Sequence, residues 1–291
     1  MQANGLATNT VRSTKYILKR LNRETDLMNP EAVKLYVGKL TLCNPTKQKM
    51  IECYEYFVET NQLQWTKPRY RWDTKTPMIP LKHQVEAIIA AASFKCATIF
   101  TILAETGLEG AELHNVTEKD IDSEQGIITA AGNKGHSGRS FRLKRHTAEM
   151  LRIYLEKYRT NRRFNQQKTA GRPFPKPQIM SQAWRDARKR AATKLNNPEL
   201  DKILLKSLRN YSGAQLYYLT SDPWRVMLHL GHKKLETTQH YISGMKPMND
   251  DQEWTCKTAA NAKEASELIE QGFTFVERIE SEGLSLYRKR K

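Results

Sequence analysis

The sequence has few cysteines, and they form no recognisable site. The four among its 291 residues, Cys43, Cys53, Cys96 and Cys256, are scattered. They form neither a C-x-x-C pair nor a Cys/His cluster at the spacing of a zinc site. This distribution predicts reduced residues in the core or at element boundaries, and neither disulfides nor a bound metal.

Long hydrophobic runs are also missing. No apolar stretch approaches the roughly 18 residues of a membrane-spanning helix. The first ten residues, MQANGLATNT, lack the apolar core of a signal peptide. We therefore expect a cytoplasmic protein with no membrane partner.

Acidic residues are in short supply relative to basic ones. The chain has 48 Lys and Arg against 31 Asp and Glu, a formal net charge of +17. An excess of this size favours a polyanionic partner, most often nucleic acid. The alternative is a solvated basic surface with no such partner.

The first quarter of the chain has helical patterns, over residues 13–25, 29–40 and 44–60. Residues 1–75 contain 13 basic and 7 acidic side chains, a net charge of +6. This favours a small helical domain that lies against DNA, although a basic bundle without that role would have the same pattern. Residues 66–80, TKPRYRWDTKTPMIP, contain three prolines and predict a domain boundary.

The rest of the chain predicts a mostly α fold with a small β-sheet. Residues 81–107 are strongly helical in pattern, and the segments GIITA and RSFRL flank a glycine-rich turn typical of a β-hairpin. Further helices are predicted over residues 146–160, 181–195, 206–219 and 223–230. Beyond residue 250 the pattern predicts strand, helix, strand, turn and strand.

Two segments together indicate a function. LKSLRNYSGAQLYYL contains Arg209, and LHLGHKKLETTQHYI contains His232 and, nine residues later, Tyr241. Each residue alone would have an ordinary structural role, as an ion-pair former, a helix-cap histidine and a packed aromatic. In this order and spacing, over roughly residues 12–245, the chain resembles the tyrosine recombinase (phage integrase) family. That family has an H-x-x-R box, a Gly-His box and a tyrosine nine residues beyond it.

The resemblance implies DNA strand cleavage by attack of a tyrosine hydroxyl, leaving a 3′-phosphotyrosyl link and needing no metal or other cofactor. It makes Tyr241 the nucleophile, Arg209 a phosphate clamp and His232 a hydrogen-bond donor or proton-transfer partner. Cationic donors suit the non-bridging phosphate oxygens, and the leaving oxygen needs an acid. Lys134, in the turn AAGNKGHSG, matches the family's general-acid lysine. The other interpretation of Lys134 is a solvated turn lysine.

The chain departs from the family pattern at Lys206, where most members have histidine. Lysine there resembles the variant of archaeal integrases, and an ammonium can still donate to a phosphate. We therefore interpret Lys206 as a mark of an archaeal-type lineage.

A second departure is Glu109, in TGLEGAEL, which stands where the family's first catalytic arginine is expected. Two like charges a few ångströms apart cost about 4 kcal/mol at an effective dielectric near 20. Moreover, if Glu105, Glu109 and Glu112 stack on one helix face, they repel one another, whereas an arginine at 109 would pair with the other two. The repulsion predicts impaired cleavage, and the spacing of the glutamates indicates a local sequence suited to a positive charge at 109. The glutamate is then either an introduced substitution or the mark of a natural member that has lost the cleavage step.

The resemblance divides the chain into four parts. It implies a helical SAM-like core-binding domain over residues 1–72, a linker over 73–79, an α+β tyrosine recombinase catalytic domain over 80–250 and a small α+β extension over 251–291. The expected partners are double-stranded DNA and further copies of the chain, assembled on DNA as a tetrameric synapse. Bound to DNA, the protein would be associated with the nucleoid.

The predicted function is site-specific recombination or integration, as in mobile genetic elements. The alternative is a catalytically degenerate, recombinase-derived DNA-binding or architectural protein, which Glu109 favours. A type IB topoisomerase shares the tyrosine chemistry, but the length and box spacing fit integrases better.

Overall fold

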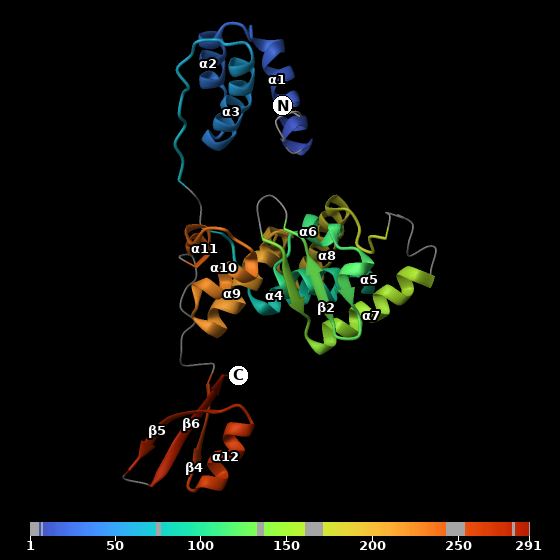
Figure 1. Ribbon diagram of the computed structural model, residues 1–291, viewed down its shortest axis with the longest axis vertical. Helices are drawn as coiled ribbons and strands as arrows, with labels where there is room; N and C mark the ends of the chain where they lie inside the picture. The colour runs from blue at the N-terminus through green and yellow to red at the C-terminus, as the bar shows by residue number, and fades with distance from the viewer. Residues whose placement is uncertain are drawn as a thin grey trace. The chain divides into compact units, whose positions relative to one another are not determined.

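The chain divides into two compact units, Met1–Lys75 and Thr76–Lys291 (Figure 1). The structure is a computed structural model. It describes residues 6, 8–73, 77–132, 137–160, 171–242, 254–280 and 283–290, without the side chains of 240, 241, 254 and 290. The predicted limits of the linker, 73–79, remain a prediction, because residues 74–76 lie outside this description.

The first unit consists of the three predicted helices. They are α1 (Thr8–Glu24), α2 (Pro30–Lys39) and α3 (Asn44–Thr60). Asn29 caps α2 by accepting a hydrogen bond from Ala32 N at 3.1 Å, as short polar side chains do at helix starts. The helices enclose an apolar core that includes Leu21, Val33, Val37, Ile51 and Tyr54.

The second unit begins with a helical region that is interrupted twice. The pattern over residues 81–107 forms two helices, α4 (Lys82–Ala90) and α5 (Phe94–Thr106), followed by the short α6 (Gly110–Asn115). A 3₁₀ turn (Glu118–Asp120) leads into the sheet. After the sheet come α7 (Arg145–Thr160), α8 (Pro177–Lys194), a second 3₁₀ turn (Pro198–Lys202), α9 (Ser207–Thr220), α10 (Pro223–Leu230) and α11 (Leu235–Ile242).

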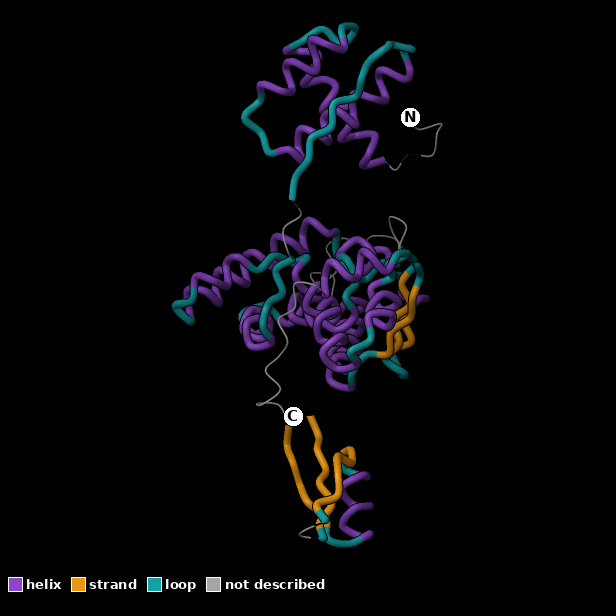
Figure 2. Tube along the Cα trace, turned by 90° about the vertical axis from the view of Figure 1, so that its left-hand side faces the viewer, coloured by secondary structure: helices purple, strands orange, loops and turns teal. Residues whose placement is uncertain are grey.

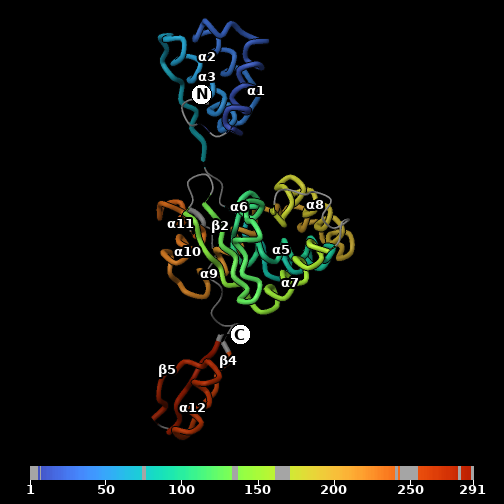
Figure 3. The backbone as a smooth tube through the Cα atoms, turned by 45° about the vertical axis from the view of Figure 1, so that its right-hand side comes forward, coloured from blue at the N-terminus to red at the C-terminus, as the bar shows by residue number. Residues whose placement is uncertain are grey.

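The sheet of this unit has three antiparallel strands in the order β1-β2-β3. The predicted hairpin is confirmed as β2 (Ile127–Ala130) and β3 (Arg139–Arg142), with Ile128 opposite Phe141. A two-residue strand, β1 (Ile121–Asp122), was not predicted. The strands lie along one side of the helices (Figure 2). In Figure 3, α9, α10 and α11 lie on one side of β2 and α5, α7 and α8 on the other.

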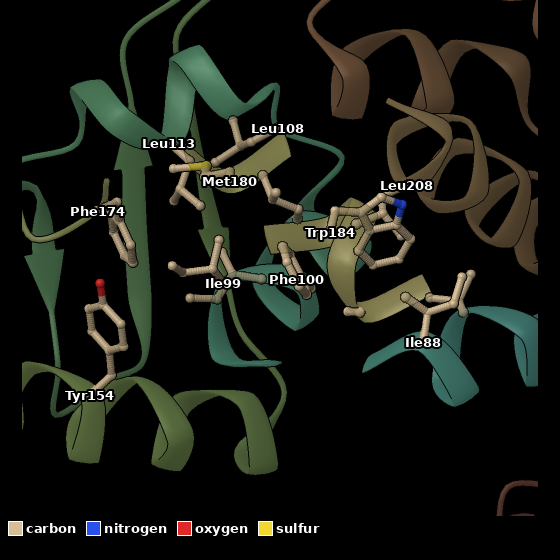
Figure 4. Packing of buried hydrophobic residues seen from close by; sticks show 14 of the residues in the cluster. Ile88, Ile99, Phe100, Leu108, Leu113, Tyr154, Phe174, Met180, Trp184 and Leu208 are labelled. Atoms are coloured by element: carbon tan, nitrogen blue, oxygen red, sulfur yellow. The ribbon is translucent and has the colours of Figure 1, made fainter. Parts of the chain in front are cut away.

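The core of this unit is built around buried aromatic residues (Figure 4). Phe100 meets Trp184 edge to face with ring centroids 4.9 Å apart, a favourable aromatic geometry. The Trp184 indole N–H donates to the Ile203 carbonyl at 2.9 Å. Leu108, Leu113 and Leu208 also enter this core and thereby fix the backbone of their polar sequence neighbours.

The end of the chain has the predicted order of elements. It forms β4 (Trp254–Ala259), α12 (Ala262–Glu270), β5 (Thr274–Ile279) and β6 (Leu284–Arg290), with strand order β4-β6-β5. A small cluster of Ala259, Leu268, Phe273 and Tyr287 joins helix and sheet. None of the helices in the described ranges is long and apolar enough to span a membrane.

Candidate active site

The turn between α5 and α6 places position 109 at the start of a helix. Gly107 ends α5 with φ of +65°, and Glu109 is the residue that precedes α6. Glycine suits this left-handed conformation. A Cβ at Gly107 would also lie only 2.9 Å from Leu230 Cδ2. Glu105 and Glu112 therefore belong to different helices, and the predicted stacking of three glutamates on one helix face is wrong.

The two outer glutamates already have partners of their own. Glu105 accepts a hydrogen bond from Thr147 Oγ1 at 2.6 Å and another from the Lys144 backbone N–H. Glu112 accepts from Arg139. The prediction that an arginine at 109 would pair with both glutamates therefore loses the shared helix face on which it was based. The motif TGLEGAEL still matches an arginine at position 109.

Arg209 is buried at the third position of α9, with 6% of its surface exposed. Its Nη1 donates to the Gly107 carbonyl at 2.7 Å, and its Nη2 donates to the Leu230 carbonyl at 2.5 Å. These carbonyls close α5 and α10, where they lack partners within their own helices. The guanidinium thus connects three sequence motifs. They are TGLEGAEL, which contains Gly107, LKSLRNYSGAQLYYL, which contains Arg209, and the Gly-His box, which follows Leu230.

Glu112 lies between two arginines. Both of its oxygens accept from Arg139, at 3.1 and 3.0 Å, while Arg209 Nη1 lies 3.7 Å from Oε2. The same Oε2 accepts from the Glu109 backbone N–H at 2.8 Å. We call Glu112, Arg139 and Arg209 the arginine–glutamate cluster. The backbone of Glu109 is therefore hydrogen-bonded directly to this cluster.

His232 links the Gly-His box to α11. The residue is buried, and its Nδ1 lies 2.9 Å from Thr238 Oγ1. Thr238 is also buried and precedes Tyr241 by three residues on α11. The described backbone therefore connects the predicted nucleophile to His232 through one turn of helix, whereas the Tyr241 side chain lies outside the described residues.

His229 is a second histidine next to the cluster. Its Nε2 lies 2.8 Å from Ser212 Oγ, and its backbone carbonyl accepts from Arg139 Nε at 2.9 Å. Burial, together with the positive charges of Arg139 and Arg209, lowers the pKa of His229 to about 4. We conclude that this imidazole is neutral at physiological pH.

We expect the protein to lose stability as the pH falls from about 6.5 toward 4. The unfolded chain, with an ordinary histidine pKa of 6.5, takes up a proton in this range before folded His229 does. The expected loss in the free energy of unfolding is about 2.5 kcal/mol. Urea titrations of the chain and of His229→Gln across this range measure it. His114→Gln, which leaves His229 in place, should retain the loss, and an equal loss in His229→Gln would contradict the assignment.

The two predicted lysines differ in what the structure describes. Lys206 is exposed and directly precedes α9, one helical turn before Arg209. Lys134 lies outside the described residues. Just beyond that gap, the Ser137 N–H donates to the Gly231 carbonyl at 3.2 Å. The described end of the hairpin turn therefore meets the Gly-His box.

Motif reasoning missed Arg139, Glu112, His229 and Thr238. Glu112 was visible as the second charged position of TGLEGAEL, and the alternation of a strand places Arg139, unlike Arg142, on the same face as Phe141. No group of His, Cys, Asp and Glu in the described ranges is arranged to hold a metal ion.

Known proteins of one family match this chain. Residues 81–246 match the model of the phage integrase family. A putative integrase/recombinase of Sinorhizobium fredii is 24% identical over 258 residues, covering 83% of this chain and 81% of that protein.

Solved structures share the fold. The Tn1549 transposon integrase in complex with circular intermediate DNA superposes with a TM-score of 0.61 at 15% identity, covering 92% of this chain and 95% of that one. A lambda integrase dimer bound to a core site has a TM-score of 0.57 at 12% identity, covering 87% and 75%. Because the family model spans more than half of the sequence, this chain belongs to the phage integrase family, the tyrosine-type site-specific recombinases.

Proposed function

We propose that this chain cleaves and rejoins DNA strands through a 3′-phosphotyrosyl intermediate at Tyr241, and that Glu109 impairs the cleavage step. The hydrogen bonds of Arg209 carry the proposal. They hold the Gly107 and Leu230 carbonyls on one guanidinium, although these carbonyls are 102 and 21 residues away in sequence. Three separate motifs thereby meet at one guanidinium, which supports the proposal.

The proposed reaction exchanges one phosphodiester for another. The Tyr241 oxygen bonds to phosphorus, its proton passes to solvent water, and the bond from phosphorus to the 5′-oxygen breaks. Lys134 supplies the proton that the leaving 5′-oxygen needs, while Arg209, His232 and Lys206 donate to the non-bridging oxygens. Attack by a 5′-hydroxyl reverses these steps and rejoins the strand.

Glu109 opposes this reaction at the place where the family has an arginine. Its backbone N–H is bonded to Glu112 within the arginine–glutamate cluster, so its carboxylate is attached beside the groups that would receive a phosphate. A carboxylate supplies no donor to the phosphate and repels its charge. Glu109 also favours the second candidate function, a recombinase-derived DNA-binding protein that no longer cleaves.

Capture of a covalent adduct tests the proposed chemistry. Glu109→Arg is incubated with nicked suicide duplexes of random core sequence, from which the cleaved strand cannot be rejoined. We expect an adduct through a 3′-phosphate that mass spectrometry places on Tyr241. Glu109→Arg/Tyr241→Phe should form none. If Glu109→Arg binds the duplexes but gives no adduct, the DNA-binding alternative is correct and the proposed chemistry is not.

Helix α1 gives the proposed DNA contact of the first unit. Arg12, Lys15, Lys19 and Arg23 follow a spacing of three to four residues, which places them on one face. All four are exposed, and the opposite face of α1 buries Thr14 and Leu21. We propose that this basic stripe contacts the DNA backbone, as positive side chains on one helix face are suited to do.

The salt dependence of DNA binding tests the basic stripe. For Lys15→Gln/Lys19→Gln we expect the slope of log K against log salt to fall by about 2, because each phosphate contact contributes roughly 0.9. Lys34→Gln/Lys49→Gln removes the same charge from the same unit, but these lysines already pair with Glu31 and Glu52. That control should change the slope by less than half as much. If the two variants have equal slopes, the basic stripe of α1 does not contact the DNA backbone.

Two further points extend the proposal. The resemblance suggests assembly of several copies on DNA, with the extension beyond residue 250 helping to join them. Lys206 suggests an archaeal-type lineage. Truncation at about residue 250 that left DNA binding and multimer formation unchanged would rule out a role of the extension in assembly.

A further inference from the structure

Four hydrogen bonds fix the side chain of Arg139. It is the first residue of β3, and its guanidinium donates to both oxygens of Glu112, to the His229 carbonyl and to the Ser137 carbonyl, at 2.9 to 3.1 Å. Its side chain is 8% exposed and that of Glu112 is fully buried. A buried two-oxygen pairing of this kind fixes the carboxylate in one orientation.

Glu112 could in principle bind Arg209 in the same way. Instead Arg209 Nη1 lies 3.7 Å from Oε2, beyond hydrogen-bonding distance, while Arg139 occupies both oxygens. One carboxylate between two guanidiniums leaves the cluster with a net charge of +1. Without Arg139, the charges of Glu112 and Arg209 would sum to zero, and the carboxylate could accept hydrogen bonds from Arg209.

The fold reserves space for the Arg139 guanidinium. Gly231 has φ of +71°, and a Cβ there would collide with Arg139 Nη1. The carbonyl of His229 faces the same guanidinium from the last turn of α10, where helix carbonyls favour a positive charge. The glycine of the Gly-His box is thus needed by Arg139 as well as by the turn.

We propose that Arg139 is a positioning residue that occupies Glu112, so that the positive charge of Arg209 is not cancelled at the scissile phosphate. The inference rests on the proposed function. It assigns Arg139 no contact with DNA; the residue acts through Glu112 on Arg209.

The test uses substrate charge and second-site suppression in the Glu109→Arg background, on a duplex recovered as a covalent adduct. Arg139→Gln should slow adduct formation at least about tenfold. On a duplex with a scissile methylphosphonate, which lacks the negative charge, the deficit should shrink to less than about threefold, because a neutral phosphorus group needs less cationic stabilisation.

Adding Glu112→Gln should partly restore cleavage of ordinary DNA, since it removes the competing carboxylate. Arg142→Gln, an exposed change on the same strand, should cleave like its parent.

A merely structural role of Arg139 predicts an equal deficit on both substrates and no suppression by Glu112→Gln, and either result overturns the inference. A second measurement needs no cleavage. In urea unfolding of the full chain, the coupling between Arg209→Gln and Glu112→Gln should be larger in an Arg139→Gln background than with Arg139 present. Unchanged coupling overturns the inference. Absence of any adduct from Glu109→Arg refutes the proposed function instead, and the unfolding cycle still decides the role of Arg139.

Discussion

Glu109→Arg should raise the rate of DNA strand cleavage at least about 100-fold over the chain with its present glutamate. Loss of one preorganised donor to a charged transition state typically costs 100- to 1000-fold, and the glutamate adds repulsion to that loss. The cluster can accept the change, because Glu109 is half-buried at the start of α6 and not inside a helix. Single-turnover adduct formation on a suicide duplex measures the rate.

Different substitutions at position 109 separate the two causes of slow cleavage, which are the missing cationic donor and the repulsion by the carboxylate. Glu109→Gln removes the repulsion but supplies no cationic fork, so we expect a gain of about tenfold, roughly the size of a modest charge effect. Glu109→Arg should add the rest. Glu124→Arg makes the same change in net charge at an exposed turn of the same unit and should leave the rate as it is. A chain that cleaves equally well with glutamate and arginine at 109 would refute our explanation of this residue.

Glu112→Leu should lower the free energy of unfolding of the second unit by about 3 to 5 kcal/mol. The substitution leaves the guanidiniums of Arg139 and Arg209, 8% and 7% exposed, without the carboxylate that lies between them. Buried charges that lose their partner cost far more than exposed ones. Urea unfolding followed by tryptophan fluorescence measures the effect, because Trp184 lies in the core of that unit.

We expect the loss of stability to depend on how buried an ion pair is, and not on the distance between its charged atoms. Glu118 pairs with Arg159 at 2.7 Å, but their side chains are 31% and 56% exposed, so Glu118→Leu should cost less than about 1 kcal/mol. Glu112→Leu/Arg139→Met should recover part of the loss, since one of the unpaired charges is removed. If Glu112→Leu costs no more than Glu118→Leu, the cluster does not stabilise the fold as described.

Periodicity predicted most helices of the fold because their buried faces are local patterns. Residues 146–160 were predicted as a helix, and α7 runs from Arg145 to Thr160 with Leu151, Tyr154 and Leu155 buried. The break between α4 and α5 had no proline or glycine to mark it. The two-residue strand β1 was too short to have a period of its own.

The site could be predicted only as far as its motifs extend. Arg209, His232 and Tyr241 follow from spacing. The error over the three glutamates arose at Gly107, where Leu230 and Ser212, more than 100 residues away, leave no room for a Cβ. Strand alternation separates Arg139 from Arg142, but the partners of Arg139, Glu112 and the His229 carbonyl, come from α6 and α10. Such long-range contacts leave no local pattern in a single sequence.

The left-handed turn at Gly107 has a consequence for how easily this protein could change its activity. Because the turn ends α5 before position 109, the residue there is the N-cap of α6 and is only half-buried, whereas Leu108 beside it is buried. The charge at that position can therefore be reversed while the surrounding scaffold keeps its contacts. A single codon would then separate a recombinase from a DNA-binding relative of the same shape, in either direction.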